Sequence, residues 1–213
     1  MTLLPTGVVF DCDGTLVDTE PLSELAWREV LGRRGYVPTA DDFAAVLGRH
    51  AARSLAHFGA RVALGDPDAF RAELRAAFDR HFDAGVHVFP DAVATIAALH
   101  EAGVPVAVAS SSSRRHVLRS LAACGLADVV VAAVGADDVD DHKPHPRPYL
   151  VAAEALGVPP RSCTAVEDSQ VGVASAAAAG MFTVAVRRGH VPDEDLALAD
   201  RLVDELSLAA LTR

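Results

Sequence analysis

The stretch VVFDCDGT, residues 8–15, is an apolar run that ends in two carboxylates one residue apart. An extended backbone places residues i and i+2 on the same side, so Asp11 and Asp13 are expected to crowd each other where the strand ends. Two close carboxylates repel, which pushes one toward holding a proton unless a cation lies between them. A site that needs an ionised nucleophile and a proton donor can use that difference. By itself the stretch is equally compatible with a common Asp-Gly turn, which Gly14 allows.

Around this stretch, short apolar segments alternate with helical patterns. The first kind predicts strands buried on both faces, and the second predicts helices between them. Alternation of this kind indicates an α/β fold, in which helices cover both faces of a parallel sheet. The expected strands are 7–10, 104–109, 129–133, 163–166 and 182–186, and the expected helices are 92–101, 114–124, 146–156 and 170–179.

The gap between the first two expected strands holds helical patterns and no convincing strand. The patterns are 21–35, 41–47, 52–61 and 67–84, and glycines or prolines separate them. We therefore expect an inserted helical domain over residues 19–87. Residues 1–18 and 88–213 would then form the α/β core.

Composition narrows the class of protein. The 213 residues carry 19 basic and 29 acidic side chains, a net charge of −10, which argues against a nucleic-acid or anionic-membrane partner. The longest weakly polar stretch, 171–186, is too short to span a bilayer, since about 20 residues are needed. Three cysteines at unrelated spacings predict neither a zinc site nor a disulfide framework. With no basic residue before the first apolar run, we expect a cytoplasmic protein rather than a secreted one. We also expect it to be a monomer.

A run of serines follows the expected strand 104–109. A hydroxyl at the carboxyl end of a parallel strand faces the crevice where open α/β sheets bind ligands. The N-terminus of the next helix adds amide donors that suit a phosphate. Ser110 and Ser111 are therefore candidate phosphate ligands. The alternative is that these serines only cap the helix.

The segment HKPHP contains Lys143, which is the single lysine of the chain. A lysine fixed by the following proline, ahead of a helix, is a point charge that can hold a phosphoryl oxygen and steady an ionised carboxylate. The alternative is a solvated loop lysine, the usual fate of this residue. His142 and His145 are expected to be surface residues rather than metal ligands.

The expected strand 163–166 runs into two acidic residues, Glu167 and Asp168. Carboxylates at a strand end are oxygen donors suited to Mg²⁺, which takes few protein ligands and keeps waters. The alternative is an aspartate that caps the next helix.

Taken together, these segments resemble the four motifs of the haloacid dehalogenase superfamily, which consists mostly of Mg²⁺-dependent phosphatases. The matching residues are DCDGT, the apolar strand that ends at Ser110, KPHP, and VEDSQVGVASAAAAGM, in family order. The resemblance covers essentially the whole chain. It implies a Rossmann-like core with an inserted helical cap.

The resemblance also implies the chemistry. Asp11 would attack a phosphoryl group and become an aspartyl phosphate. Asp13 would protonate the leaving oxygen and then deprotonate the incoming water. Lys143, with Ser110 and Ser111, would bind the phosphoryl oxygens.

For the cofactor, the resemblance implies Mg²⁺. Its ligands would be the Asp11 carboxylate, the Asp13 backbone carbonyl and Asp168, with Glu167 in or next to the coordination shell. The dehalogenases of the superfamily lack the second aspartate of the first motif and need no metal. The presence of Asp13 therefore disfavours dehalogenation.

The insert matches the position of the small helical cap in the β-phosphoglucomutase-like branch. In that branch the cap closes over the site and chooses the substrate. Arg49 and His50, beside Gly48, would lie in a specificity loop and contact a polar or anionic substrate. Trp27 and Ser23 share a helical face and would either look into the crevice or, for Trp27, pack in the core of the cap.

Two departures bear on the reaction. The mutases of the branch have a histidine where this chain has Ser23, and an arginine aligned with Ala51. We therefore expect a phosphatase for a small sugar phosphate or organic-acid phosphate. The alternatives are a β-phosphoglucomutase-like mutase and a non-catalytic binding protein, which the intact acidic and lysine positions argue against.

Overall fold

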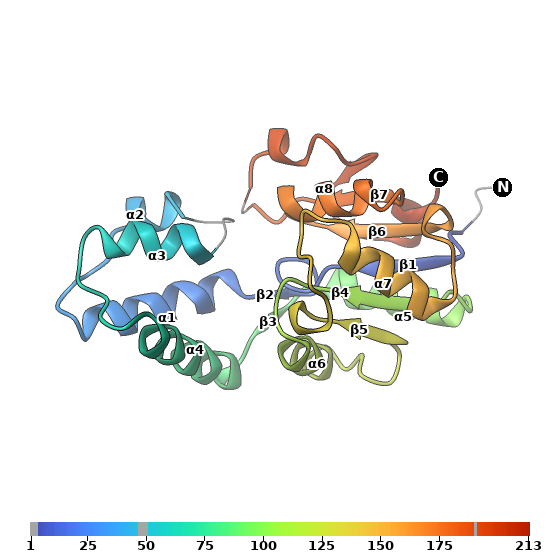
Figure 1. Cartoon of the computed structure of the whole chain (residues 1–213). Helices are drawn as coiled ribbons and strands as arrows, with labels where there is room; N and C mark the ends of the chain where they lie inside the picture. The colour runs from blue at the N-terminus through green and yellow to red at the C-terminus, as the bar shows by residue number, and fades with distance from the viewer. Residues whose placement is uncertain (1–3, 47–50, 190) are drawn as a thin grey trace. The chain divides into compact units, whose positions relative to one another are not determined.

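The computed structural model describes residues 4–46, 51–189 and 191–213. The chain divides into two compact units, Met1–Val17 with Val88–Arg213 and, between them in the sequence, Asp18–His87. The first contains a six-stranded sheet with helices, and the second contains helices α1 to α4 (Figure 1). This confirms the α/β class with a parallel sheet and a helical insert.

The sheet of the first unit has the order β5-β4-β1-β6-β7-β8, and all neighbouring strands run parallel. The first strand therefore lies between β4 and β6, with the chain building outward on one side of it and then on the other. The carboxyl end next to such a reversal is where open α/β sheets bind ligands. The strands are β1 Gly7–Phe10, β4 Val106–Ala109, β5 Ala132–Val134, β6 Cys163–Glu167, β7 Phe182–Val186 and β8 Arg201–Val203.

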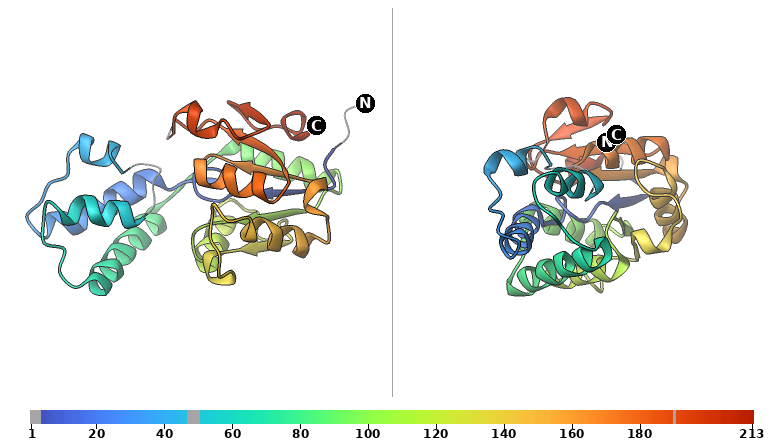
Figure 2. Two further views of the ribbon diagram at one scale, coloured as in Figure 1. Left: turned by 45° about the horizontal axis from the view of Figure 1, so that its top comes forward. Right: turned by 60° about the vertical axis from the view of Figure 1, so that its left-hand side comes forward.

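Helices cover both faces of this sheet (Figures 1 and 2). Helices α7 (Arg147–Leu156) and α8 (Gln170–Ala178) pack on one face, and α5 (Pro90–Glu101) and α6 (Arg114–Ala123) on the other. Small strand residues such as Ala107 and Ala165 let α7 approach closely, and the large Tyr149 fills the space above them. Burial on both faces explains why the central strands contain almost no polar residue.

Several element boundaries differ from those expected, and three short strands were not predicted. Strand β5 begins three residues later than expected, because residues 126–130 form a hydrogen-bonded turn and Val131 is 60% exposed. The short edge strand β8 was not predicted. Neither were β2 (Val17–Asp18) and β3 (His87–Val88), which pair with each other where the chain enters and leaves the second unit. Strands of two or three residues carry too little periodicity to be recognised. The remaining elements are short 3₁₀ helices at Ala136–Asp138, Pro160–Ser162, Asp193–Leu196 and Leu208–Leu211.

The second unit has an aromatic core. Trp27 is 7% exposed, and its ring centroid lies 4.8 Å from that of Phe58 and 5.5 Å from that of Phe70. Of the two expectations for Trp27, packing in the core of the insert is therefore the correct one. The helices are α1 Glu20–Gly32, α2 Ala40–Ala44, α3 Ala51–Gly59 and α4 Pro67–Ala84.

This unit also buries a carboxylate, Asp42, at the start of α2. Its oxygens accept hydrogen bonds from the backbone and hydroxyl of Thr39 and from the hydroxyl of Tyr36 at 2.9 Å, and they contact His57 and Arg61. The Thr39 amide, followed by His57, lowers the pKa of Asp42, so the group is ionised. The cluster ties α2 to α3 within the unit.

Two expectations from composition concern the whole chain. No helix in the described part of the chain is long and apolar enough to cross a membrane. The three cysteines, Cys12, Cys124 and Cys163, are buried and free. Burial raises the pKa of Cys124 and of Cys163 to about 11, so these thiols pack as small apolar groups.

Candidate active site

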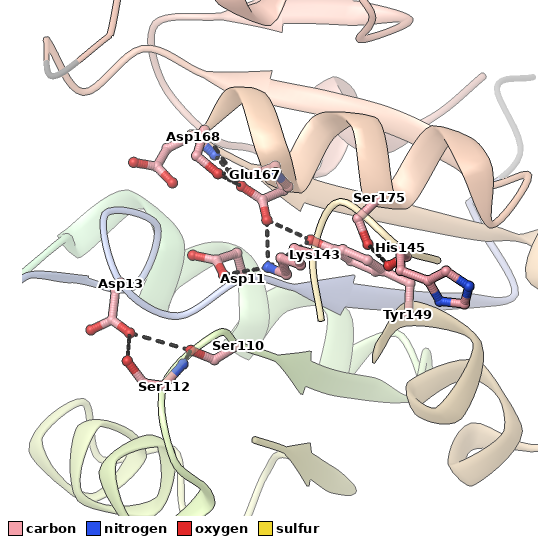
Figure 3. Close-up of polar contacts among 12 residues, drawn as sticks. Asp11, Asp13, Ser110, Ser112, Lys143, His145, Tyr149, Glu167, Asp168 and Ser175 are labelled. Carbon is pink, nitrogen blue, oxygen red and sulfur yellow. Dashed lines mark hydrogen bonds and ion pairs between the residues drawn. The ribbon is translucent and has the colours of Figure 1, made fainter. Parts of the chain in front are cut away.

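Polar side chains from four segments meet at the carboxyl edge of the sheet (Figure 3). Asp11 follows β1, Ser110 follows β4, Glu167 ends β6 and Asp168 comes next, while Lys143 lies in the loop before α7. All five are buried, with between 0% and 8% of their surface exposed. A polar cluster with so little exposure must satisfy its charges internally.

The turn after β1 lies close to the segment that follows β6. Gly14 has φ +84°, and its amide donates to the Val17 carbonyl at 2.8 Å. A Cβ atom at this position would overlap the carboxylate of Asp168. Glycine is therefore required both by the backbone conformation and by the approach of the β6 loop.

Lys143 lies between two carboxylates. Its Nζ donates to Oδ1 of Asp11 at 2.6 Å and to Oε1 of Glu167 at 2.5 Å, and it lies 4.9 Å from the centroid of the Tyr149 ring (Figure 3). Burial acts to lower the pKa of Lys143, but Asp11 and Glu167 outweigh it, and the net change is a raised pKa. The ammonium group is therefore charged and faces the site rather than solvent.

Glu167 receives hydrogen bonds on both oxygens. Oε1 accepts from Lys143 and from the hydroxyl of Tyr149 at 2.9 Å, and Oε2 accepts from the amide of Asp168 and from both the amide and the hydroxyl of Ser169. A Cβ atom at Gly172 would overlap this carboxylate, so the helix that follows also confines it. We infer that Glu167 chiefly orients Lys143.

Asp11, the candidate nucleophile, is difficult to ionise in these surroundings. Burial, followed by the neighbouring Glu167, raises the pKa of Asp11 to about 7, against the lowering effect of Lys143. One ammonium group thus faces three buried carboxylates, those of Asp11, Glu167 and Asp168. A further positive charge at this point would release the Asp11 proton and supply the nucleophile.

These three carboxylates fit a divalent cation. Each of Asp11, Glu167 and Asp168 offers an oxygen, and these atoms lie within 4.8 Å of one another. They form the candidate metal site found among the residues that the structure describes. An all-oxygen, carboxylate-rich donor set suits a hard cation such as Mg²⁺ rather than zinc or copper. Asp13 is predicted to bind the cation through its backbone carbonyl, so its side chain need not lie among these three carboxylates.

The Asp13 carboxylate has different surroundings. Its Oδ2 accepts from the hydroxyls of Ser110 at 3.2 Å and Ser112 at 2.8 Å, and its Oδ1 lies 2.8 Å from Nε2 of His116 (Figure 3 shows the serines). The side chain of Asp13 is 26% exposed, whereas that of Asp11 is buried. The two aspartates of the first motif are therefore held by separate sets of partners.

Other predicted residues lie elsewhere. The side chain of Ser111 is exposed beside the site, and its predicted phosphate contact stays a prediction. His142 and His145 are exposed loop residues, as expected. Arg49 and His50, predicted for the specificity loop, lie outside the described residues.

The sequence did not point to three residues that complete this geometry. Tyr149 lies under Lys143, and Ser112 and His116 contact Asp13. In the sequence, Tyr149 has the pattern of a buried helix position, and Ser112 and His116 have the pattern of the start of a helix. Ser112 and His116 lie more than 95 residues from Asp13 in the sequence, so only the folded chain reveals their contacts with it.

Comparison with known proteins agrees with this site. The model of the haloacid dehalogenase-like hydrolases matches residues 5–180, and the chain belongs to this family. Hexitol phosphatase A of Escherichia coli K12 is 37% identical over 191 residues, which cover 84% of this chain and 82% of the relative. Fructose-1-phosphate phosphatase YqaB of the same organism is 36% identical over 182 residues, covering 85% and 96%.

A solved structure gives the same result at the level of the fold. CbbY from Rhodobacter sphaeroides in complex with phosphate superposes with a TM-score of 0.83 at 28% identity, covering 98% of this chain and 99% of that one. By its family and these relatives, the chain is a phosphatase of the haloacid dehalogenase-like hydrolases.

The raised pKa of Asp11 predicts a pH-dependent stability change. Without a divalent cation, Asp11→Asn should stabilise the protein, and by more at about pH 8 than at about pH 5. Unfolded aspartate ionises near pH 3.9, whereas folded Asp11 holds its proton until about pH 7. Its destabilising effect therefore grows from about pH 4 to about pH 7 and is constant above that. Urea unfolding in EDTA at both pH values measures this, and an equal effect at both would contradict a raised pKa.

The hydroxyl of Tyr149 provides a second prediction. Tyr149→Phe keeps the ring below Lys143 but removes the hydrogen bond to Glu167, so Lys143 should lose part of its orientation. We expect kcat on para-nitrophenyl phosphate to fall about three- to tenfold, which is less than the roughly 1.5–3 kcal/mol of a hydrogen bond to a charged group, because Lys143 keeps its contacts with Glu167 and Asp11. KM should change little.

The chain contains one other tyrosine, which serves as a matched control. Tyr36→Phe also removes a hydrogen bond to a buried carboxylate, that of Asp42, but in the second unit. It should lower the melting temperature and leave kcat on this small ester unchanged. Equal kcat values for Tyr149→Phe and wild type would show that the Tyr149 hydroxyl serves only the fold.

Proposed function

We propose that this phosphatase hydrolyses the monoester of a small phosphorylated sugar, polyol or organic acid through a phosphoryl group on Asp11, with Mg²⁺ as cofactor. One observation carries the proposal: the buried Asp11 carboxylate, at the end of β1, is 2.6 Å from the ammonium group of Lys143. A carboxylate beside a fixed positive charge, at the edge where open α/β sheets bind ligands, supports the role of Asp11 as nucleophile.

In the first step, a carboxylate oxygen of Asp11 attacks phosphorus. The bond between phosphorus and the ester oxygen breaks, and Asp13 gives its proton to that oxygen as the alcohol leaves. Lys143 and Ser110 donate to the phosphoryl oxygens, whose charge rearranges during transfer. The 2.6 Å contact also holds Asp11 in one rotamer, which favours an in-line approach.

In the second step, water attacks the phosphorus of the aspartyl phosphate. The water proton passes to Asp13, and the bond between phosphorus and Asp11 breaks. Inorganic phosphate leaves, Asp11 regains its carboxylate and Asp13 is again protonated. The side chain of Asp13 is about a quarter exposed, so it can exchange protons with solvent between turnovers.

The cation would be held by the carboxylates of Asp11 and Asp168 and by the backbone carbonyl of Asp13, with Glu167 next to the shell. When bound, Mg²⁺ offsets the negative charge of the phosphoryl group and of the carboxylates around it. Because Glu167 already accepts hydrogen bonds from Lys143, Tyr149 and the Ser169 backbone, it supports the site mainly through Lys143.

The two units divide the work in this proposal. Residues 1–18 and 88–213 carry the chemistry, and residues 19–87 act as a cap that selects the substrate, with Arg49 and His50 as candidate contacts. The named substrates of the relatives, a hexitol phosphate and fructose 1-phosphate, support a polyhydroxylated substrate. Ser23 and Ala51, which replace the histidine and arginine of the mutases, favour hydrolysis over phosphoryl transfer within a sugar.

A panel of phosphorylated sugars, polyols and organic acids tests the proposal. The wild type should release phosphate from a subset of them, and Asp11→Asn should release none. Lys143→Ala should lower kcat about a hundredfold or more, as expected for loss of one preorganised charge donor.

Arg161 is exposed and lies before β6, at the opposite edge of the sheet. As a matched loss of positive charge, Arg161→Ala should keep the wild-type rate. Turnover by pure Asp11→Asn protein would exclude the aspartyl-phosphate route. Conversion of β-glucose 1-phosphate to glucose 6-phosphate would instead establish the mutase.

Removal of divalent cations should abolish turnover. Exhaustive treatment with EDTA leaves three buried carboxylates facing the anionic substrate, and added Mg²⁺ should restore the rate. Ca²⁺ should not, because its larger, looser coordination shell misplaces the reacting groups. Mg²⁺ should also raise the melting temperature of the wild type more than that of Asp168→Asn. Full activity after chelation would disprove the cofactor assignment.

A further inference from the structure

The carboxylate of Asp13 is held from two sides. Two hydroxyls, those of Ser110 and Ser112, donate to Oδ2, and the imidazole of His116 contacts Oδ1 at 2.8 Å. The same imidazole nitrogen lies 3.4 Å from the hydroxyl of Ser120, one turn further along α6. An aspartate with this number of directed partners has one preferred rotamer rather than several.

His116 is held close to Asp13 by its place in α6. It lies in the first turn of this helix, where Ser113 caps the helix and accepts from the His116 amide. The His116 side chain is only 11% exposed. A largely buried imidazole needs a polar partner, and the Asp13 carboxylate provides one.

The serines alone do not fix Asp13 during the reaction. In the proposed function, Ser110 turns its single hydroxyl proton toward a phosphoryl oxygen and so gives up its bond to Asp13. Its oxygen already accepts from the Ser112 amide at 3.0 Å, which keeps the residue in place. Asp13 then retains Ser112 on Oδ2 and His116 on Oδ1.

We propose that His116 is a positioning residue for the general acid: its Nε2 holds Oδ1 of Asp13, so that the acidic proton takes the position on Oδ2 that Ser110 gives up. That position lies next to the phosphoryl group that Ser110 then binds. The inference rests on the proposed function. It goes beyond that function by assigning to His116 the orientation of the acidic proton of Asp13.

Comparing esters with different leaving groups tests whether His116 orients the acidic proton. Proton delivery matters for an alcohol that leaves as a poor anion and matters little for one that leaves readily without a proton. Phenyl phosphate and para-nitrophenyl phosphate have nearly the same shape but differ in this respect. A residue that aims the acid should therefore affect the two esters unequally, whereas a residue that only supports the fold should affect both alike.

The experiment compares kcat/KM for both esters in three variants. kcat/KM reports the steps up to the first transfer, in which Asp13 acts as acid. His116→Leu, which removes the donor, should lower kcat/KM on phenyl phosphate about tenfold more than on para-nitrophenyl phosphate, a fraction of the 10²–10⁴ that general acid catalysis contributes. His116→Gln, which returns an N–H donor, should recover most of that difference. His100→Leu, an exposed histidine on α5, is the matched control and should match the wild type.

The outcomes separate the inference from the function on which it rests. Equal losses on both esters, or no recovery in His116→Gln, would overturn the inference while the wild type remains a phosphatase. A wild type that hydrolyses no phosphate ester would remove the proposed function and the inference with it. If His116→Leu does not fold, His116→Phe, which also lacks an N–H donor but keeps a planar ring, provides the same test, and an equal loss on both esters would again overturn the inference.

Discussion

The site depends on a buried ionic network, in which the ammonium group of Lys143 pairs with the carboxylates of Asp11 and Glu167. Burying charges is costly, and one ammonium group does not balance the carboxylates around it, so such a network is rarely retained for stability alone. Here the single lysine of the chain connects the loop before α7 to the ends of β1 and β6. It thereby links three segments that are far apart in the sequence, and it orients the carboxylate of Asp11, the proposed nucleophile.

The topology of the sheet makes that pair possible. Because β1 lies between β4 and β6, the loops that follow these strands open at the same edge, and each carries one kind of group: acid after β1, hydroxyl after β4, acid after β6. Gly14 then allows the loop after β1 to pass directly beside Asp168. The site is thus built on the ends of rigid strands, which gives its groups the precision that a reaction needs.

The central strands and the polar residues at their ends could be predicted from the sequence, because local residue patterns determine them. Runs such as VVF before Asp11 are buried on both faces, and their apolar character marks the strands together with the polar residues that end them. Strand β5 was misplaced because Val129, Val130 and Val131 look like a strand but form a turn and its exit, where hydrogen bonds to Leu126 and to β4 decide the backbone. Tyr149 and His116 were missed because nothing near them in the sequence states which distant carboxylate they contact.

The two aspartates of the first motif show how one short stretch can supply two kinds of acid. In the folded chain their carboxylates have different partners: Asp11 is directed to Lys143, and Asp13 to hydroxyls and an imidazole. Asp11 is buried among carboxylates, which raises its pKa to about 7 and leaves its ionisation dependent on positive charge nearby. Asp13 is partly exposed and can exchange its proton with water. A nucleophile benefits from the first environment and a reusable proton carrier from the second, so the division of partners supports the proposed division of roles.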